Sequence, residues 1–128
     1  MRMDRNRDAD GPLVRGFGAD GFKVDDIEGR IGVYPALLLT ATRADPWSPP
    51  PFEELDVAAV EAILSSAPEF ILLGTGATLR QPTRAFVRAV EARGVGVEAM
   101  DSRAAARAWG VLRAENRVVA AALYPLGA

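Results

Sequence analysis

The chain has 128 residues, a formal net charge of −2, and neither Cys nor His. This length fits one domain, and the missing residue types exclude disulfides, thiol nucleophiles, zinc–thiolate sites, iron–sulfur clusters and histidine chemistry. The slightly acidic balance also argues against a nucleic-acid-binding protein, which usually carries a concentrated basic surface.

The first residues alternate Arg and Asp and carry few apolar side chains. This pattern predicts a disordered tail over residues 1–15, followed by a single domain over residues 16–128. A secretory signal needs an apolar core after its basic start, and none is present. No segment reaches the roughly 18–20 apolar residues of a membrane span. We therefore expect a cytoplasmic protein that is not an integral membrane protein.

The N-terminal part of the domain is typical of short strands and turns. Residues 22–27 carry a short strand–turn–strand signal around Asp25-Asp26, and Ile31–Leu39 predicts a further strand in which Pro35 indicates an edge or a bulge. Residues 40–51 predict a loop that ends in the proline run 49–51. This run is either a stiff connector or a polyproline II ligand for another protein.

From residue 52 onward the pattern alternates between helix and strand. The predicted elements are a helix over Phe52–Leu64, a strand over 70–73, a helix over 82–93, a strand over 95–100, a helix that starts at Asp101 or Ser102 and runs to Arg113 with Val111 and Leu112 on its apolar side, and a strand over 118–123. Such a β-α-β-α-β order implies parallel strands joined by right-handed crossovers, with the helices on one face. The strands are apolar throughout, so the N-terminal β segments are expected to cover the other face.

Gly74, Thr75 and Gly76 form a candidate ligand loop between a strand and a helix. In nucleotide-binding folds such a turn brings backbone N–H groups to a phosphate, and Asp101 stands near the place of a ribose-binding acid. However, Leu79 occupies the place of the third glycine, and no Lys-Ser/Thr pair follows. The loop is thus either a small-anion or nucleotide site or a tight turn, with Asp101 as a helix N-cap.

Arg80, Arg84 and Arg88 lie four residues apart, which predicts one exposed stripe on a helix. This stripe is a candidate partner-facing surface, and a merely solvated helix face is the alternative. The acidic residues lie mostly at helix starts, at turns and in the tail, so no carboxylate pair suggests acid–base catalysis. We expect no catalytic, cofactor or metal site, and therefore no enzyme.

Three ordered segments resemble one known family. They are Phe70–Gly76 (FILLGTG), Gly94–Ala105 (GVGVEAMDSRAA) and Glu115–Leu123 (ENRVVAAAL), preceded by Gly21-Phe22 and Pro46-Trp47. The chain resembles, over residues 16–126, the Mth-type domain family of unknown function, whose members include the mitochondrial complex I assembly factor three and the adipogenesis-associated Mth domain protein. The resemblance implies an α/β fold of three layers, β/β/α. In that fold a central, mostly parallel sheet carries helices on one face and the N-terminal β segments on the other.

The resemblance implies no enzymatic activity and no cofactor. It suggests a non-enzymatic protein-interaction or assembly-factor-like module that works with respiratory complex I or with export and inner-membrane assembly components, which is compatible with a peripheral place at the inner membrane. The chain departs from the family at Ala108-Trp109-Gly110, where relatives have Thr-Tyr-Asn. A role of that Tyr-Asn pair therefore does not carry over, and Gly110 weakens its helix by about 1 kcal/mol relative to Ala.

Overall fold

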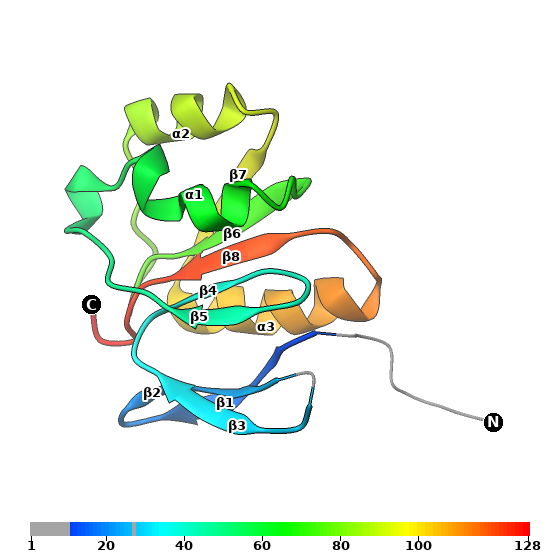
Figure 1. The fold of residues 1–128 in the computed structure, drawn as a ribbon. Coiled ribbons are helices and arrows are strands. Elements are labelled where there is room, and N and C mark those ends of the chain that lie inside the picture. The colour runs from blue at the N-terminus through cyan, green and yellow to red at the C-terminus, as the bar shows by residue number, and fades with distance from the viewer. Residues whose placement is uncertain (1–10, 27) are drawn as a thin grey trace.

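The computed structural model describes residues 11–26 and 28–128, which form two β-sheets and three α-helices (Figure 1). The first sheet is antiparallel and consists of β1 (Leu13–Gly18), β2 (Gly21–Asp25) and β3 (Ile31–Tyr34). The second, central sheet has the strand order β5-β4-β8-β6-β7. Its strands are β4 (Leu37–Leu39), β5 (Ala44–Pro46), β6 (Phe70–Gly74), β7 (Gly96–Met100) and β8 (Ala120–Leu123).

The central sheet is mixed. Strand β6 runs parallel to β7 and β8, whereas β4 runs antiparallel to both β5 and β8. The α/β class is thus confirmed, but the prediction of a mostly parallel sheet is wrong. The difference arises because the β4–β5 hairpin, which is too short to give a strong pattern in the sequence, extends the sheet beyond β8.

The three helices are α1 (Glu61–Leu64), α2 (Arg84–Glu91) and α3 (Ser102–Ala114). Helix α3 begins directly after Asp101, whose carboxylate accepts a hydrogen bond from the Ala104 N–H at 2.9 Å. Asp101 is therefore a helix N-cap. The helix predicted over Phe52–Leu64 is broken into two 3₁₀ turns, Phe52–Glu54 and Val57–Val60, followed by α1.

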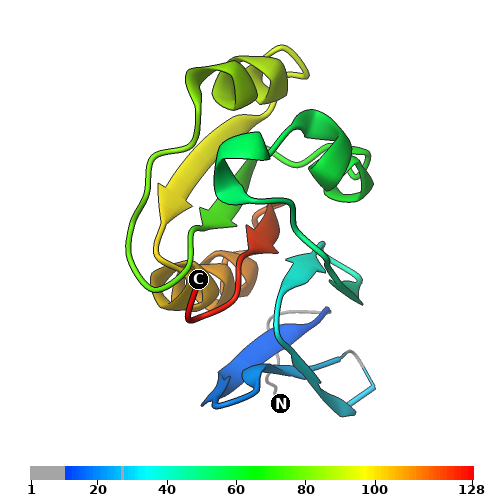
Figure 2. The ribbon, with the colours of Figure 1, turned by 90° about the vertical axis from the view of Figure 1, so that its left-hand side faces the viewer.

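Strands β4, β6, β7 and β8 contribute to two cores, because their side chains alternate between the two faces of the sheet. On one face the strands pack against α1 and α2, through Ile63, Ile71, Leu73, Phe86, Val90, Ala120 and Ala122. On the other face they pack against α3 and the small sheet, through Phe22, Val24, Leu72, Ala105, Trp109, Ala121 and Leu123. Figure 2 shows α1 and α2 on one side of the central strands and α3 on the other.

The prediction that the helices cover a single face is therefore wrong for α3. The chain moves from β6 to β7 in one direction along the sheet and then passes back across β6 to reach β8. Two right-handed crossovers in opposite directions place their helices on opposite faces. Helix α3 consequently shares its face with the three-stranded sheet.

The ordered domain begins earlier than the sequence predicts. Strand β1 starts at Leu13, and the buried carbonyl of Pro12 accepts a hydrogen bond from Trp109 Nε1 at 2.9 Å. Residues 11–15, predicted as part of the tail, therefore belong to the fold. The disorder predicted for residues 1–10 falls outside the described residues.

The strand predicted over Ile31–Leu39 is two strands that belong to different sheets, β3 and β4, with Pro35 between them. The segment after β4 forms β5, and the residues that follow β5 pack against the rest of the domain. Trp47 Nε1 donates to the Ala59 carbonyl at 3.0 Å, and the Pro50 carbonyl accepts a hydrogen bond from the Tyr124 hydroxyl at 2.8 Å. These contacts favour the stiff-connector interpretation of the proline run.

Candidate functional site

The loop at Gly74–Gly76 follows β6 at the carboxyl end of the sheet, where open α/β sheets usually bind ligands. Its backbone N–H donors, and the next one along the chain, already have partners inside the protein. The bonds are Thr75 N–H to the Met100 carbonyl at 2.9 Å, Gly76 N–H to Ser102 Oγ at 2.8 Å, and Ala77 N–H to the Ala128 carbonyl at 3.1 Å. None of these three N–H groups is therefore available to bind a phosphate.

The two glycines are required by close packing. A Cβ at Gly74 would lie 2.8 Å from Leu123 Cδ2 and 2.9 Å from Ser102 Oγ, and Gly76 has a φ of +103°, which side chains rarely adopt. Ser102 is fully buried and fastens the loop to the last strand, because its hydroxyl also donates to the Tyr124 carbonyl at 2.8 Å. The geometry is that of a structural junction between β6, α3 and β8.

Contrary to the prediction from the sequence, Arg80 does not lie on a helix with Arg84 and Arg88. Its Nε and Nη2 atoms donate to the Thr75 carbonyl at 3.1 and 2.9 Å, and its guanidinium carbon lies 4.3 Å from the centroid of the Phe52 ring. Helix α2 begins only at Arg84, so the prediction of one stripe with three arginines is wrong for Arg80. Arg84 and Arg88 are exposed on α2, and their partner-facing role stays a prediction.

An aromatic cluster closes the same end of the sheet. The ring of Tyr124 meets Trp47 and Phe52 edge to face, at centroid distances of 5.1 and 5.4 Å. Burial raises the pKa of Tyr124 to about 12, and nearby Arg80 opposes this shift only in part. The phenol therefore stays neutral at physiological pH and acts as a hydrogen-bond donor to the connector.

An opening lies between β6, β7 and α3, and we call it the β7–α3 groove. Its volume is about 420 Å³, and it is lined by Phe70, Leu72, Glu98, Met100, Ala108, Val111 and Leu112. Glu98 is the one charged residue among these, and Val111 is 60% exposed. A volume of this size lies within the range of known ligand sites, which is roughly 300–1,000 Å³.

The groove follows from the topology. Helix α3 packs on β6, β8 and β1, while β7 is the edge strand beside them (Figure 2). The side of β7 that carries Glu98 and Met100 is thus left only partly covered, whereas Val97 on its other side packs into the core beneath α2. On the helix side, the lining includes the small side chain of Ala108.

This site was not among those predicted from the sequence. Val111 was expected on the apolar side of the last helix, but the structure exposes it at the groove. The available signal was Glu98, an acidic residue inside a strand that is otherwise apolar and therefore predicted to be buried. A charged residue in such a strand indicates that one face of the strand meets solvent.

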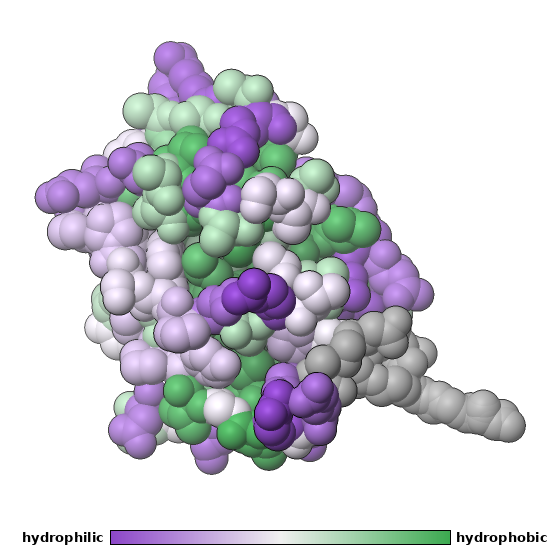
Figure 3. All heavy atoms as spheres, in the orientation of Figure 1, coloured by the Kyte–Doolittle hydropathy of each residue, from purple (hydrophilic) through white to green (hydrophobic). Residues whose placement is uncertain are grey.

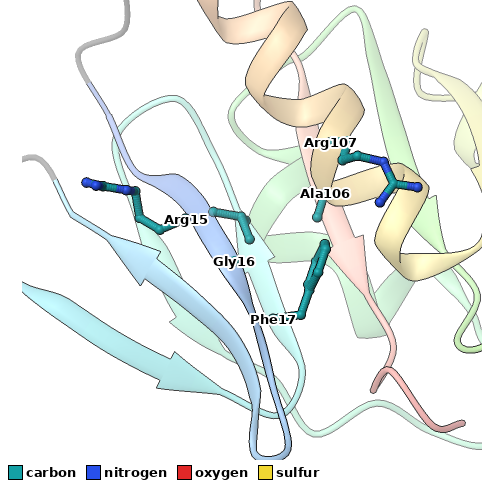
Figure 4. Close-up of a pocket in the computed structure, with 6 residues that line it drawn as sticks. Arg15, Gly16, Phe17, Ala106 and Arg107 are labelled. Carbon is teal, nitrogen blue, oxygen red and sulfur yellow. The ribbon is translucent and has the colours of Figure 1, made fainter.

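Two further openings, of about 120 and 130 Å³, are smaller than the groove. A crevice of about 120 Å³ lies between β1 and α3, where the Phe17 ring points toward Ala106 while Arg15 points away (Figure 4). This volume is well below that of typical ligand pockets. An exposed apolar pair, Ile31 and Val33, lies on β3, where Figure 3 shows hydrophobic surface next to hydrophilic side chains, and neither residue lines any of these openings.

Within residues 11–26 and 28–128, no three His, Cys, Asp or Glu side chains come together in a way that could hold a metal ion. In the same part of the chain, no helix has the length and apolar character needed to cross a membrane.

Comparison with known proteins agrees with the fold. Residues 14–124 match the family described as protein of unknown function (DUF498/DUF598). An uncharacterised protein of Rhodobacter capsulatus is 34% identical over 113 residues, which cover 88% of this chain and 84% of the relative. A crystal structure of a Bordetella parapertussis protein is 30% identical with a TM-score of 0.76, covering 89% of this chain and 95% of the other.

A solution structure of a Bordetella pertussis protein, described as a Mth938-like domain, is 25% identical with a TM-score of 0.76, covering 99% of this chain and 94% of the other. The descriptions of these relatives name no activity, substrate or partner. The resemblance to Mth-type domains is confirmed: the chain belongs to the DUF498/DUF598 family, whose function is unknown, and has the Mth938-like fold.

Proposed function

We propose that the chain is a non-enzymatic protein-interaction module whose binding surface is the β7–α3 groove. The observation that carries this proposal is the groove's apolar lining, left open to solvent beside an edge strand. Exposed apolar patches of this kind on soluble domains commonly mark interaction sites. We also propose that the protein is cytoplasmic and that its partners belong to respiratory complex I or to the inner-membrane assembly machinery, as the family resemblance suggests.

The alternative of a small-anion or nucleotide site at Gly74–Gly76 receives no comparable support. The N–H groups of Thr75 and Gly76 are bound to Met100 and Ser102, and Gly76 is packed closely against Ala128. A phosphate could bind there only after internal hydrogen bonds had been broken, among them the bond to the fully buried Ser102 hydroxyl.

The test compares two substitutions of the same type at similarly exposed positions. Val111→Glu places a charge in the groove, and Val33→Glu places one on β3, where the side chains are 60% and 51% exposed. Wild type and both variants are used as bait for membranes containing complex I and for cytosol, and bound proteins are quantified by mass spectrometry.

We expect a protein that wild type and Val33→Glu retain equally and that Val111→Glu loses. Circular dichroism and thermal melting check that both variants are folded. If the folded Val111→Glu variant retains the same proteins as wild type, the groove is not the binding surface. If none of the three baits retains a protein, the chain is not an interaction module.

A further inference from the structure

We propose that the β7–α3 groove binds an extended segment of a partner protein, which adds to β7 as a further strand and places a Lys or Arg side chain against Glu98. This inference rests on the proposed function and specifies its partner. It draws on three features: the free edge of β7, the apolar lining of the groove, and the single carboxylate within it.

The outer edge of β7 presents backbone N–H and C=O groups that do not bond to β6. Gly96 N–H donates to the Glu69 carbonyl at 3.1 Å, and the Met100 carbonyl accepts from Thr75 N–H at 2.9 Å, so the even-numbered residues of β7 bond toward β6. In a parallel ladder the residues between them direct their N–H and C=O groups away from that neighbour. These are Val97 and Ala99, and within the described part of the chain β7 has no second neighbouring strand.

The other edges of the two sheets are less suited to strand addition. Strand β5, the opposite edge of the central sheet, has only three residues and ends in Pro46, which lacks an N–H. Strand β3, an edge of the small sheet, carries exposed Ile31 and Val33 but lines none of the openings. Strand β1, the other edge of the small sheet, has an irregular register between Val14 and Gly16 and lines only the crevice of about 120 Å³. Strand β7 has five residues and combines a free edge with the groove of about 420 Å³.

The groove selects the side chains of the added strand. Alternate side chains of that strand would lie beside Glu98 and Met100 and reach toward Val111 of α3. Apolar side chains fit most of this lining. A residue directly opposite Glu98 on the same face would have its Cβ about 4.5–5.5 Å from that of Glu98, within reach of an ion pair with Lys or Arg.

Glu98 is free to make this pair. It is exposed, and none of the ion pairs formed among residues 11–26 and 28–128 includes it. Arg117, whose guanidinium carbon lies 5.8 Å from the centroid of the Phe70 ring, is already held by Glu69 at 2.8 Å. A cationic side chain from the partner is therefore the complement that the groove lacks.

The same carboxylate disfavours a second copy of this chain as the occupant. Glu98 is the central residue of β7, so two antiparallel copies of β7 around a twofold axis would place the two Glu98 side chains opposite or diagonal to each other. Like charges in such positions are destabilising. Charge complementarity thus favours a basic partner over self-association.

The experiment selects short random peptides displayed on phage against the full chain, without any assumption about the natural partner. We expect enriched peptides to contain Lys or Arg, with apolar residues at the second position before and after it. Nuclear magnetic resonance of the isotope-labelled protein should show the amides of Val97 and Ala99 shifted and slowed in hydrogen exchange when a peptide is bound. The same selection on Glu98→Lys should enrich Asp or Glu in place of the basic residue.

Two matched variants separate the strand edge from the charge. Ala99→Pro removes an outward N–H, whereas Ala99→Ser keeps it, and we expect only the proline variant to lose affinity, by about tenfold or more. Glu98→Gln should weaken binding of the basic peptides by about tenfold and leave their salt dependence smaller. If Ala99→Pro does not fold, the hydrogen-exchange rates of Val97 and Ala99 in wild type decide the question of strand addition.

The outcomes distinguish this inference from the proposed function. Strand addition is overturned if peptides bind the grooves of wild type and Ala99→Pro equally well, or if they show no preference for a basic residue. In either case the proposed function as an interaction module still stands. Enriched peptides that shift only amides remote from β7, or a selection that enriches nothing, also overturn the inference. The Val111→Glu comparison described above then decides independently whether the groove binds a protein.

Discussion

The loop at the carboxyl end of β6 and the β7–α3 groove differ in how they use the groups that the sheet exposes. In the loop, the N–H groups of Thr75 and Gly76 donate to Met100 and Ser102, and aromatic rings close the same end of the sheet. The groove runs along the α3 face of β6 and β7, from Phe70 to Met100, and within the described residues its edge strand and apolar cavity have no partner. A glycine-rich turn at a conventional position can thus be structural, while the available binding surface lies where a helix fails to cover an edge.

The largest effect is expected at Trp109, which fastens the helix that forms one wall of the groove. Its side chain is fully buried, and Nε1 donates to the Pro12 carbonyl at 2.9 Å. We expect Trp109→Ala to lower the free energy of unfolding by about 3–5 kcal/mol, measured by urea denaturation. Trp109→Phe keeps most of the volume but leaves the Pro12 carbonyl unpaired, and should cost less, about 1–3 kcal/mol. Equal losses in the two variants would contradict this assignment of packing and hydrogen bonding.

The next largest effect is expected at the Gly74–Gly76 loop. Ser102 Oγ accepts the Gly76 N–H and donates to the Tyr124 carbonyl, both at 2.8 Å. Ser102→Ala leaves two buried backbone groups unpaired, so we expect the free energy of unfolding to fall by about 1–3 kcal/mol. The control is Ser65→Ala, an exposed hydroxyl that donates to the Ala62 carbonyl, with an expected change within about 0.5 kcal/mol. The loop is not a junction if both serine variants unfold like wild type.

A smaller effect, of opposite sign, is expected inside helix α3. Gly110 lies inside α3, and a Cβ at this position would meet no atom within 4 Å. We expect Gly110→Ala to raise the free energy of unfolding by about 0.5–1 kcal/mol, because alanine loses less backbone entropy in a helix. Gly94→Ala is the matched control: its space is equally open, but its φ of +79° makes alanine destabilising. Thermal melting of both variants should show shifts in opposite directions.

Much of the fold follows from local pattern. The sequence correctly predicted the strands at Phe70, Val95 and Val118, the N-cap at Asp101, and the α/β class. It missed the hairpin partner β5 and the break at Pro35, because very short strands carry too few residues for a periodic signal. It also placed α3 on the wrong face, since the face depends on the spatial strand order, which local periodicity does not contain.

The sites were harder to predict than the fold. The spacing of Arg80, Arg84 and Arg88 suggested one helical stripe, but α2 starts only after Pro82 and Thr83, so Arg80 binds the Thr75 carbonyl instead. The β7–α3 groove depends on β7 being the edge strand and on the position of α3 across the sheet. Both are long-range features that a single sequence does not reveal.

The smallest effect concerns acid sensitivity. Arg93 donates two hydrogen bonds to the Glu61 carboxylate, at 2.7 and 2.8 Å, and thereby lowers the pKa of Glu61 below its ordinary value of 4.5. Arg117 lowers the pKa of Glu69 in the same way. Because the unfolded chain binds these protons first, the stabilisation is complete above about pH 4.5 and is lost as the pH falls through the lower, folded-state pKa values.

Both ion pairs are exposed, so the effect on the melting temperature should be slight and should shrink as salt is added. We expect the double variant Glu61→Gln, Glu69→Gln to melt slightly below wild type at neutral pH and to approach it as the pH is lowered below 4.5. The control is Glu91→Gln, an exposed carboxylate outside the ion pairs formed by residues 11–26 and 28–128. A constant difference between the double variant and wild type across the acid range would show that the two ion pairs do not cause the loss of stability in acid.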